Sequence, residues 1–114
     1  MAVRKFACGL ERHRPGQMNK TEKRYADELD LQLKAGLIEW WGFESIKLKL
    51  ANATFYTPDF MVLGCDGVIE FRETKGFWTD DARVKIKVAA DKYWMFRFIA
   101  LKVGKSGTWI REDF

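Results

Sequence analysis

Two segments of the chain carry apolar residues at helical spacing. The first predicted helix begins near a Thr21 N-cap and stops at Gly36. Its apolar stripe consists of Tyr25, Ala26, Leu29 and Leu33. The second predicted helix runs from a Thr79 N-cap to about Tyr93. Its stripe consists of Ala82, Ile86, Ala89 and Tyr93. Each helix therefore presents one apolar face to a core.

Glu22 interrupts the pattern of the first helix. It lies on the apolar stripe, three residues before Tyr25, where a carboxylate is unexpected. One interpretation is an ordinary first-turn acid that the helix dipole favours. The other is a functional group at the end of a buried face.

Extended segments lie between and after the helices. Residues 37–51 include an alternation typical of a half-buried strand, with Ile46, Leu48 and Leu50 separated by Lys47 and Lys49. A turn is expected at Asn52-Ala53. Further strands are predicted at residues 60–63, 68–75 and 95–103, and the tail from Gly104 is left unassigned. The order of helix, strands, helix and strand predicts an α/β domain with helices packed on a mixed sheet.

The two strands around Gly64-Cys65-Asp66-Gly67 have a predictable register. A three-residue loop that ends at Gly67 places glycine where a left-handed conformation is needed. This loop pairs Met61 with Phe71 and Asp59 with Glu73, so that one apolar face ends in two carboxylates. A two-residue loop would mix apolar and charged residues on both faces, and burial therefore favours the first register.

Asp59 and Glu73 suggest chemistry because two carboxylates directly opposite each other repel. A hard divalent cation such as Mg²⁺ between them would relieve the repulsion, generate hydroxide and stabilise the charge that grows on phosphorus. Lys75 shares the face of Glu73 and can orient or deprotonate the attacking water, or offset phosphate charge. Glu-x-Lys alone is commonly a surface ion pair, and Pro-Asp is ordinary turn chemistry. The combination, with an apolar face leading into it, points to catalysis.

Charge and composition bear on the class of binding partner. The 114 residues suit one domain, residues 19–114, after a basic arm at residues 1–18. The formal net charge is +4, with positive clusters in residues 1–20 and 83–92. Clustered positive charge suits nucleic acid, although ordinary solvated surface explains the charge equally well. The candidate nucleic-acid contacts are Lys20, Lys23, Arg83, Lys85 and Lys87.

The cysteines and the hydropathy pattern exclude other classes. Cys8 and Cys65 form no CxxC pair, which argues against a zinc site or a disulfide framework. Reduced thiols in a cytoplasmic protein are expected. No apolar run approaches the roughly 18 residues of a membrane helix.

The candidate site resembles a known motif. Pro58-Asp59, followed after thirteen residues by Glu73-Thr74-Lys75, resembles the signature of the PD-(D/E)XK nuclease superfamily. The Tyr-Thr-Pro-Asp-Phe sequence at residues 56–60 and the Glu-x-Lys-Gly-Phe sequence at residues 73–77 resemble more closely a family of small phage-encoded nucleases. These are related to phage endonuclease I and to archaeal Holliday junction resolvases. The resemblance covers about residues 18–103.

The resemblance implies a restriction-endonuclease-like fold, with a mixed sheet of four to five strands flanked by helices. It implies Mg²⁺ or Mn²⁺ held by Asp59, Glu73 and a glutamate of the first helix, whose place Glu22 occupies. With Lys75, these three are the candidate catalytic residues. It also implies endonucleolytic hydrolysis of DNA, often branched DNA such as a Holliday junction, by a homodimer.

Arg72 departs from the family pattern, in which an aliphatic residue is more usual beside the catalytic glutamate. We expect Arg72 to point to the opposite face of its strand and to form a salt bridge with Glu70.

Three functions stay open at this stage. The first is an active DNase, either structure-specific or of the restriction or repair type with a different DNA substrate. The second is a catalytically inactive nucleic-acid-binding module on the same fold. The third is an interaction domain with Trp40-Trp41 and Trp109 at a partner surface. One of the adjacent tryptophans is expected in the core and the other exposed, because neighbouring strand residues point to opposite faces.

Overall fold

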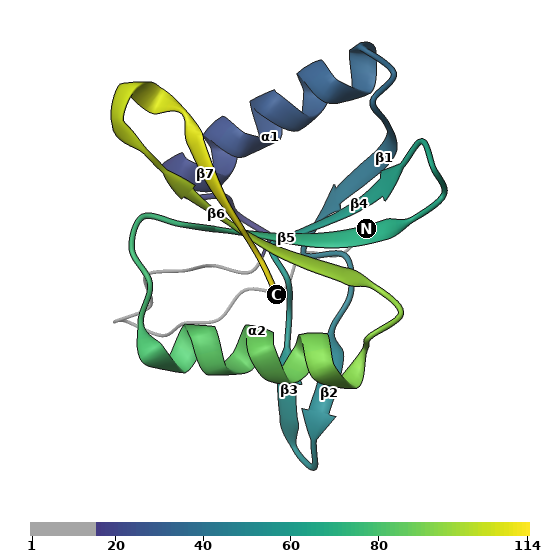
Figure 1. Ribbon diagram of the computed structural model, residues 1–114, viewed down its shortest axis with the longest axis vertical. Coiled ribbons are helices and arrows are strands. Elements are labelled where there is room, and N and C mark those ends of the chain that lie inside the picture. Colours follow the sequence, from purple (N-terminus) through teal and green to yellow (C-terminus); the bar gives the residue numbers. More distant parts are fainter. Residues whose placement is uncertain (1–15) are drawn as a thin grey trace.

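A five-stranded mixed sheet lies between two helices in the computed structural model, which describes residues 16–114 (Figure 1). The sheet has the order β1-β4-β5-β6-β7, in which only β5 and β6 are parallel neighbours. Its strands are β1 (Ile38–Phe43), β4 (Phe60–Gly64), β5 (Ile69–Lys75), β6 (Arg97–Val103) and β7 (Trp109–Asp113). The remaining elements are α1 (Lys20–Lys34), α2 (Asp80–Lys92), the hairpin of β2 (Leu48–Ala51) and β3 (Thr54–Tyr56), and a short 3₁₀ turn at Lys105–Gly107. The predicted α/β class is confirmed.

The two helices cover opposite faces of the sheet, and each closes a separate apolar core. This division follows from the alternation of side chains along the central strands. The buried core under α1 includes Tyr25, Leu29, Phe60, Val62 and Ile99. The buried core under α2 includes Tyr56, Phe71, Ile86, Ala89 and Phe98. The strands β4 and β6 are therefore apolar on both faces in their central parts, and the hydrophobic effect fixes their position. The strand β5 is apolar only on the face toward α2 and carries Glu70 and Arg72 on the face toward α1.

The helix starts are set by side-chain caps. Thr79 caps α2 as predicted, since its Oγ1 accepts a hydrogen bond from the Ala82 N–H at 3.2 Å. The predicted Thr21 cap of α1 is wrong, because Asn19 is the N-cap. Asn19 Oδ1 accepts from the Glu22 N–H at 2.8 Å, and Glu22 Oε1 accepts from the Asn19 N–H at 2.9 Å. This reciprocal capping box selects Asn19 over Thr21.

The register of the β4–β5 hairpin matches the prediction. Met61 pairs with Phe71, and Gly67 adopts the left-handed conformation with φ +82°. The regular ladder stops one position before Asp59. There the Asp59 N–H donates to Oε1 of Glu73 at 3.1 Å, so the contact between the two residues continues through a side chain.

The C-terminal third differs from the prediction. The strand expected at residues 95–103 begins only at Arg97, and it is followed by β7, which pairs with it in antiparallel fashion. The unassigned tail is therefore the edge of the sheet. Its residues Arg111, Glu112 and Asp113 are exposed, so β7 lacks the alternation by which a half-buried strand is recognised.

The tryptophans take different positions. Trp41 packs against the α1 core and donates from Nε1 to Asp30 at 3.0 Å, whereas Trp40 is exposed, as expected for neighbours on a strand. Trp109 packs edge-to-face on Tyr25, with ring centroids 5.0 Å apart. Trp109 thus contributes to the core of this chain.

Three further expectations concern the basic arm, the cysteines and membrane-spanning segments. Residues 1–15 of the expected basic arm, which include Cys8, lie outside the described residues. Cys65 is an exposed free thiol. Over residues 16–114, no helix combines the length and the apolar character that a membrane span requires.

Arg72 lies on the α1 face of β5, as predicted. Its Nε donates to Oε1 of Glu70 at 3.0 Å, which confirms the expected salt bridge. Its Nη1 donates to the Tyr25 hydroxyl at 2.9 Å and to Gln32 Oε1 at 3.1 Å. The side chains of Arg72 and Glu70 are only 13% and 12% exposed, so the pair holds α1 against β5 in a poorly solvated layer.

We expect Arg72→Met to lower the free energy of unfolding by about 3 kcal/mol, because breaking a buried pair leaves a carboxylate poorly compensated. The matched control is Arg97→Met, which removes the more exposed partner of Glu70 and should cost less than about 1 kcal/mol. Urea unfolding measures both. Equal losses in the two variants would contradict a structural role for the Arg72 network.

Candidate active site

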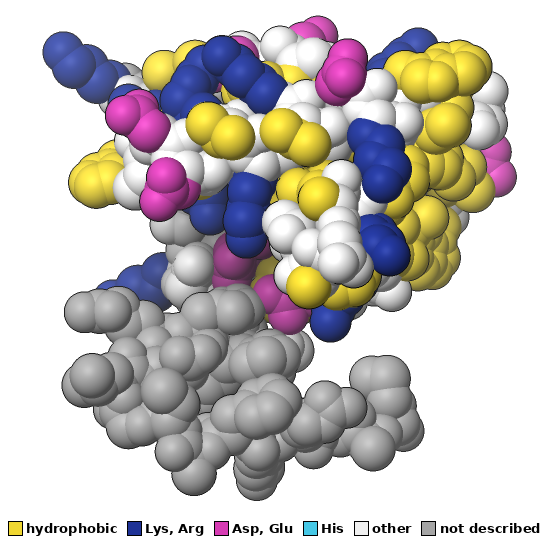
Figure 2. Space-filling view, turned by 90° about the horizontal axis from the view of Figure 1, so that it is seen from below, with side chains coloured by type: hydrophobic (Ala, Val, Ile, Leu, Met, Phe, Trp, Pro, Cys, Tyr) yellow, Lys and Arg dark blue, Asp and Glu magenta, His cyan; other side chains and the backbone are white. Residues whose placement is uncertain are grey.

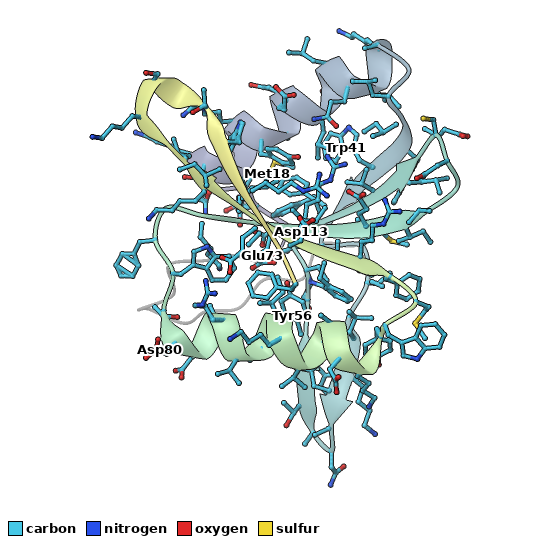
Figure 3. The ribbon with its side chains drawn as sticks, viewed as in Figure 1. Met18, Trp41, Tyr56, Glu73, Asp80 and Asp113 are labelled. Carbon is cyan, nitrogen blue, oxygen red and sulfur yellow. The ribbon has the colours of Figure 1, made fainter. Side chains whose placement is uncertain are left out.

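Three of the candidate catalytic residues, Asp59, Glu73 and Lys75, lie near one another where β5 ends, close to the start of β4. Asp59 immediately precedes β4, and Glu73 and Lys75 are the last residues of β5 on the face toward α2. Figure 3 shows the labelled Glu73 close to Tyr56, between β5 and α2. Asp59 and Glu73 are buried, with only 6% and 7% of their surface exposed.

Glu73 is the most highly connected side chain of this group. Its Oε1 accepts hydrogen bonds from the Tyr56 hydroxyl at 2.8 Å and from the Asp59 N–H at 3.1 Å. Its Oε2 lies 3.2 Å from Nζ of Lys75. Three groups from three segments therefore fix the orientation of this carboxylate.

Asp59 is oriented by the neighbouring strand. Its Oδ2 accepts from the Thr74 N–H at 3.0 Å and from the Thr74 hydroxyl at 3.3 Å. These bonds hold the carboxylate at the end of β5, next to Glu73. Among the described residues, no buried side-chain nitrogen or oxygen lacks a hydrogen-bond partner.

The two carboxylates disfavour each other's charge. Burial, followed by the negative charge of Glu73, raises the pKa of Asp59 to about 8. Burial likewise raises the pKa of Glu73, although Lys75 opposes the shift. Desolvation and a like charge are the two causes that push a carboxyl pKa upward, and both act here. Without a cation, the pair therefore tends to retain a proton near neutral pH.

Lys75 remains a cation. Burial lowers the pKa of its ammonium, but the carboxylates of Glu73 and Asp59 outweigh that effect, and the net pKa lies above its ordinary value. Lys75 also lies 5.9 Å from the ring centroid of Trp78, which contributes a weak cation–π attraction. Its charge state favours hydrogen-bond donation and charge stabilisation over proton abstraction.

Glu22 reaches the site from α1 but has a structural task as well. It is only 5% exposed, and its negative charge contributes to raising the pKa of both Asp59 and Lys75. One of its oxygens closes the capping box of α1. The first-turn and the functional interpretations of Glu22 are therefore compatible.

The residues present suit a divalent cation only in part. Asp59 and Glu73 are neighbouring carboxylates with raised pKa values, a donor set that a hard cation would stabilise. Within residues 16–114, however, no three Asp, Glu, His or Cys side chains are gathered closely enough to hold one metal ion. Asp59, Glu73 and Glu22 are thus not gathered into one set of three ligands.

The predicted nucleic-acid contacts fall into two groups. Lys20, Lys23, Lys85 and Lys87 are exposed, the first two on α1 and the last two on α2. Arg83, by contrast, donates from Nη1 and Nη2 to the carboxylate of Glu112, at 3.0 and 2.7 Å. Arg83 and Lys87 do share a groove, but acidic residues line it too. Figure 2 shows basic, acidic and apolar side chains interspersed on this side of the molecule.

Tyr56 and Thr74 are site residues whose contacts were not predicted. Both lie inside the recognised motifs, so their positions were visible in the sequence. The role of Tyr56 depends on the β2–β3 hairpin, which no strong alternation marks after Asn52. The role of Thr74 depends largely on its backbone N–H, which any residue type except proline supplies.

No family model, curated protein or solved structure matches this chain, so its own residues carry the case for its function.

The raised pKa of Asp59 predicts a pH-dependent stability when divalent cations are chelated. Between about pH 4 and 8, folded Asp59 retains a proton that the unfolded chain has released, so stability falls as pH rises. We expect the urea midpoint in EDTA to drop from pH 5 to pH 8.5, and Asp59→Asn to flatten this dependence. The exposed Asp66→Asn is the control. A parent whose stability rises over this range, or an unchanged slope in Asp59→Asn, would refute the shift.

Proposed function

We propose that this chain is a metal-dependent endonuclease that hydrolyses phosphodiester bonds in DNA through a site of the PD-(D/E)XK type. One observation carries the proposal: Asp59, Glu73 and Lys75 meet, largely buried, at the end of an apolar strand face. The sheet and helices are compatible with the restriction-endonuclease-like arrangement that the motif implies. Branched DNA, a homodimeric state and Mg²⁺ or Mn²⁺ as cofactor follow from the same resemblance.

Stability alone gives no reason for this arrangement. Burying a carboxylate disfavours its charged form, and a second carboxylate beside it adds repulsion. Burial raises the pKa of both acids even though the charge of Lys75 opposes the shift. A divalent cation would supply the missing positive charge, and cations held by carboxylates commonly bind phosphate as well.

Each residue has a role in the proposed reaction. Asp59 and Glu73 would hold the cation, which would supply Lewis acidity toward phosphate and water. Lys75 donates hydrogen bonds to the scissile phosphate or to the attacking water and stabilises developing negative charge. Glu22 adds negative charge from α1 without direct coordination.

Tyr56 and Thr74 act through these groups as positioning residues. Tyr56 fixes Oε1 of Glu73, and Thr74 fixes Oδ2 of Asp59. A carboxylate held in one orientation needs less reorganisation when substrate binds, which is the general advantage of a preorganised site.

One observation favours the second candidate, an inactive nucleic-acid-binding module on the same fold. Both oxygens of Glu73 are engaged by protein groups, and the three carboxylates are not gathered. The two candidates differ in one assay. Four-way, forked, linear and single-stranded DNA are incubated with and without Mg²⁺, and cleavage is separated from binding by gel shift in EDTA.

We expect Asp59→Asn to abolish Mg²⁺-dependent cleavage while DNA binding in EDTA stays equal or tightens, because a negative charge near phosphate is removed. Glu73→Gln should behave alike, and Lys75→Ala should slow cleavage by at least about 100-fold. Asp66→Asn, in the exposed hairpin turn, should cleave at the parental rate. Substantial activity in Asp59→Asn or Glu73→Gln would eliminate the proposed site.

Glu22 allows its two roles to be separated. Glutamine also satisfies a capping box, so Glu22→Gln should keep the melting temperature while impairing cleavage. Glu22→Ala should impair cleavage and also lose about 1 kcal/mol of stability with the cap contact. Single-turnover cleavage and thermal melting measure the two effects. A parental cleavage rate in Glu22→Gln would restrict Glu22 to the helix cap.

A further inference from the structure

The β2–β3 hairpin is a two-stranded ribbon with two different faces. Leu48 and Tyr56 are buried on its inner face, in the α2 core. Lys47, Lys49 and Phe55 are exposed on its outer face. Figure 1 shows the ribbon extending beyond α2, away from the five-stranded sheet. It is thus an amphipathic ribbon whose outer face carries two lysines and an aromatic ring.

On the outer face, the two lysines lie beside the Phe55 ring. Lys49 pairs with Phe55 across the ladder, and Nζ of Lys47 lies 5.2 Å from the centroid of the Phe55 ring. The ring is 43% exposed and supports the ammonium group through a cation–π contact. Over residues 16–114, neither lysine forms an ion pair with a carboxylate. Both charges are therefore available to an anionic partner.

In the groove that Arg83 lines on α2, by contrast, the positive charge already has a carboxylate partner. There Arg83 is bonded to Glu112, and Asp91 and Asp113 line the same groove. A phosphate that approaches Arg83 must compete with a carboxylate already in place. Among residues 16–114, no carboxylate is paired with Lys47 or Lys49, so a phosphate meets no such competitor at the ribbon.

One hydrogen bond connects the ribbon to the candidate active site, and a second connects it to the end of α2. The Tyr56 hydroxyl donates to Glu73 at 2.8 Å, from the inner face of β3. The Tyr93 hydroxyl, at the end of α2, donates to the Lys49 carbonyl at 2.7 Å. The ribbon is thereby held at a defined position relative to Glu73, and a strand bound along its outer face would be held there as well.

We propose that the outer face of the β2–β3 ribbon, formed by Lys47, Lys49 and Phe55, binds the phosphate backbone of DNA beside the scissile position. The inference rests on the proposed nuclease function and adds a binding surface to it. Lys49 on β2 and Lys47 immediately before β2 are two residues apart and can contact neighbouring phosphates, and such contacts hold DNA without reading its sequence. The ribbon therefore contributes affinity and placement but no base specificity.

The test compares Lys47→Gln/Lys49→Gln with a matched control, Lys34→Gln/Lys105→Gln. The control lysines are exposed and lie on α1 and on the turn between β6 and β7. DNA affinity is measured in EDTA from low to moderate salt. The ribbon variant should flatten the log–log salt dependence by about one to two units, since each phosphate contact releases counterions. The control variant should keep the parental slope. Equal slopes in parent and ribbon variant overturn the inference.

Cleavage kinetics provide a second readout. The ribbon variant should raise KM at least threefold with kcat within twofold of the parent, because the lysines bind DNA without touching the reacting atoms. Phe55→Leu should give a smaller change in the same direction. A ribbon variant that loses kcat at unchanged KM overturns the inference.

The two proposals fail separately. A parent that binds DNA through the ribbon but does not cleave it with Mg²⁺ or Mn²⁺ refutes the nuclease and leaves the ribbon intact. A parent that cleaves DNA, with an unchanged salt slope in the ribbon variant, refutes the ribbon alone. A parent that neither binds nor cleaves DNA refutes both.

Discussion

The close approach of the Asp59 and Glu73 carboxylates is the constraint on which the candidate site depends. The Asp59 N–H donates to Glu73, while the Asp59 carboxylate is tied to Thr74 in the same strand. Two acids are thereby held together in a buried layer, where burial raises the pKa of both and the charge of Glu73 raises that of Asp59 further. Burial of two neighbouring acids disfavours their charged forms, and a bound divalent cation would offset that cost. Lys75 offsets part of the negative charge, with its Nζ 3.2 Å from Oε2 of Glu73.

Residues on both faces of the sheet position the groups around Asp59 and Glu73. Below β5, the α2 core buries Tyr56 and so brings its hydroxyl to Glu73. Above it, the capping box places Glu22 at the first turn of α1, where its charge reaches Asp59. Arg72 fastens α1 to β5 from the opposite face of the strand. Glu22, Glu73 and Lys75 lie on regular elements, which orient side chains more firmly than loops do, and Asp59 immediately precedes β4.

The sequence predicted those parts of the structure that repeat a pattern. The hairpin register followed from the apolar face of Met61 and Phe71 together with Gly67, and the orientation of Arg72 followed from strand alternation. The β7 edge strand was missed because its charged, exposed residues show no alternation. The Tyr56 contact was missed because it arises from the packing of a three-residue strand. Long-range contacts of this kind depend on tertiary packing, which no local period encodes.

The central claim is that the Asp59–Glu73 pair binds a divalent cation. Mn²⁺ binding to the purified protein, followed by the electron paramagnetic resonance of free Mn²⁺, tests it without any nucleic acid. The account predicts that the parent binds Mn²⁺ at a site from which Mg²⁺ displaces it, and that Asp59→Asn loses this binding while remaining folded. Equal Mn²⁺ binding in the parent and in Asp59→Asn, or no binding by the folded parent, would contradict it.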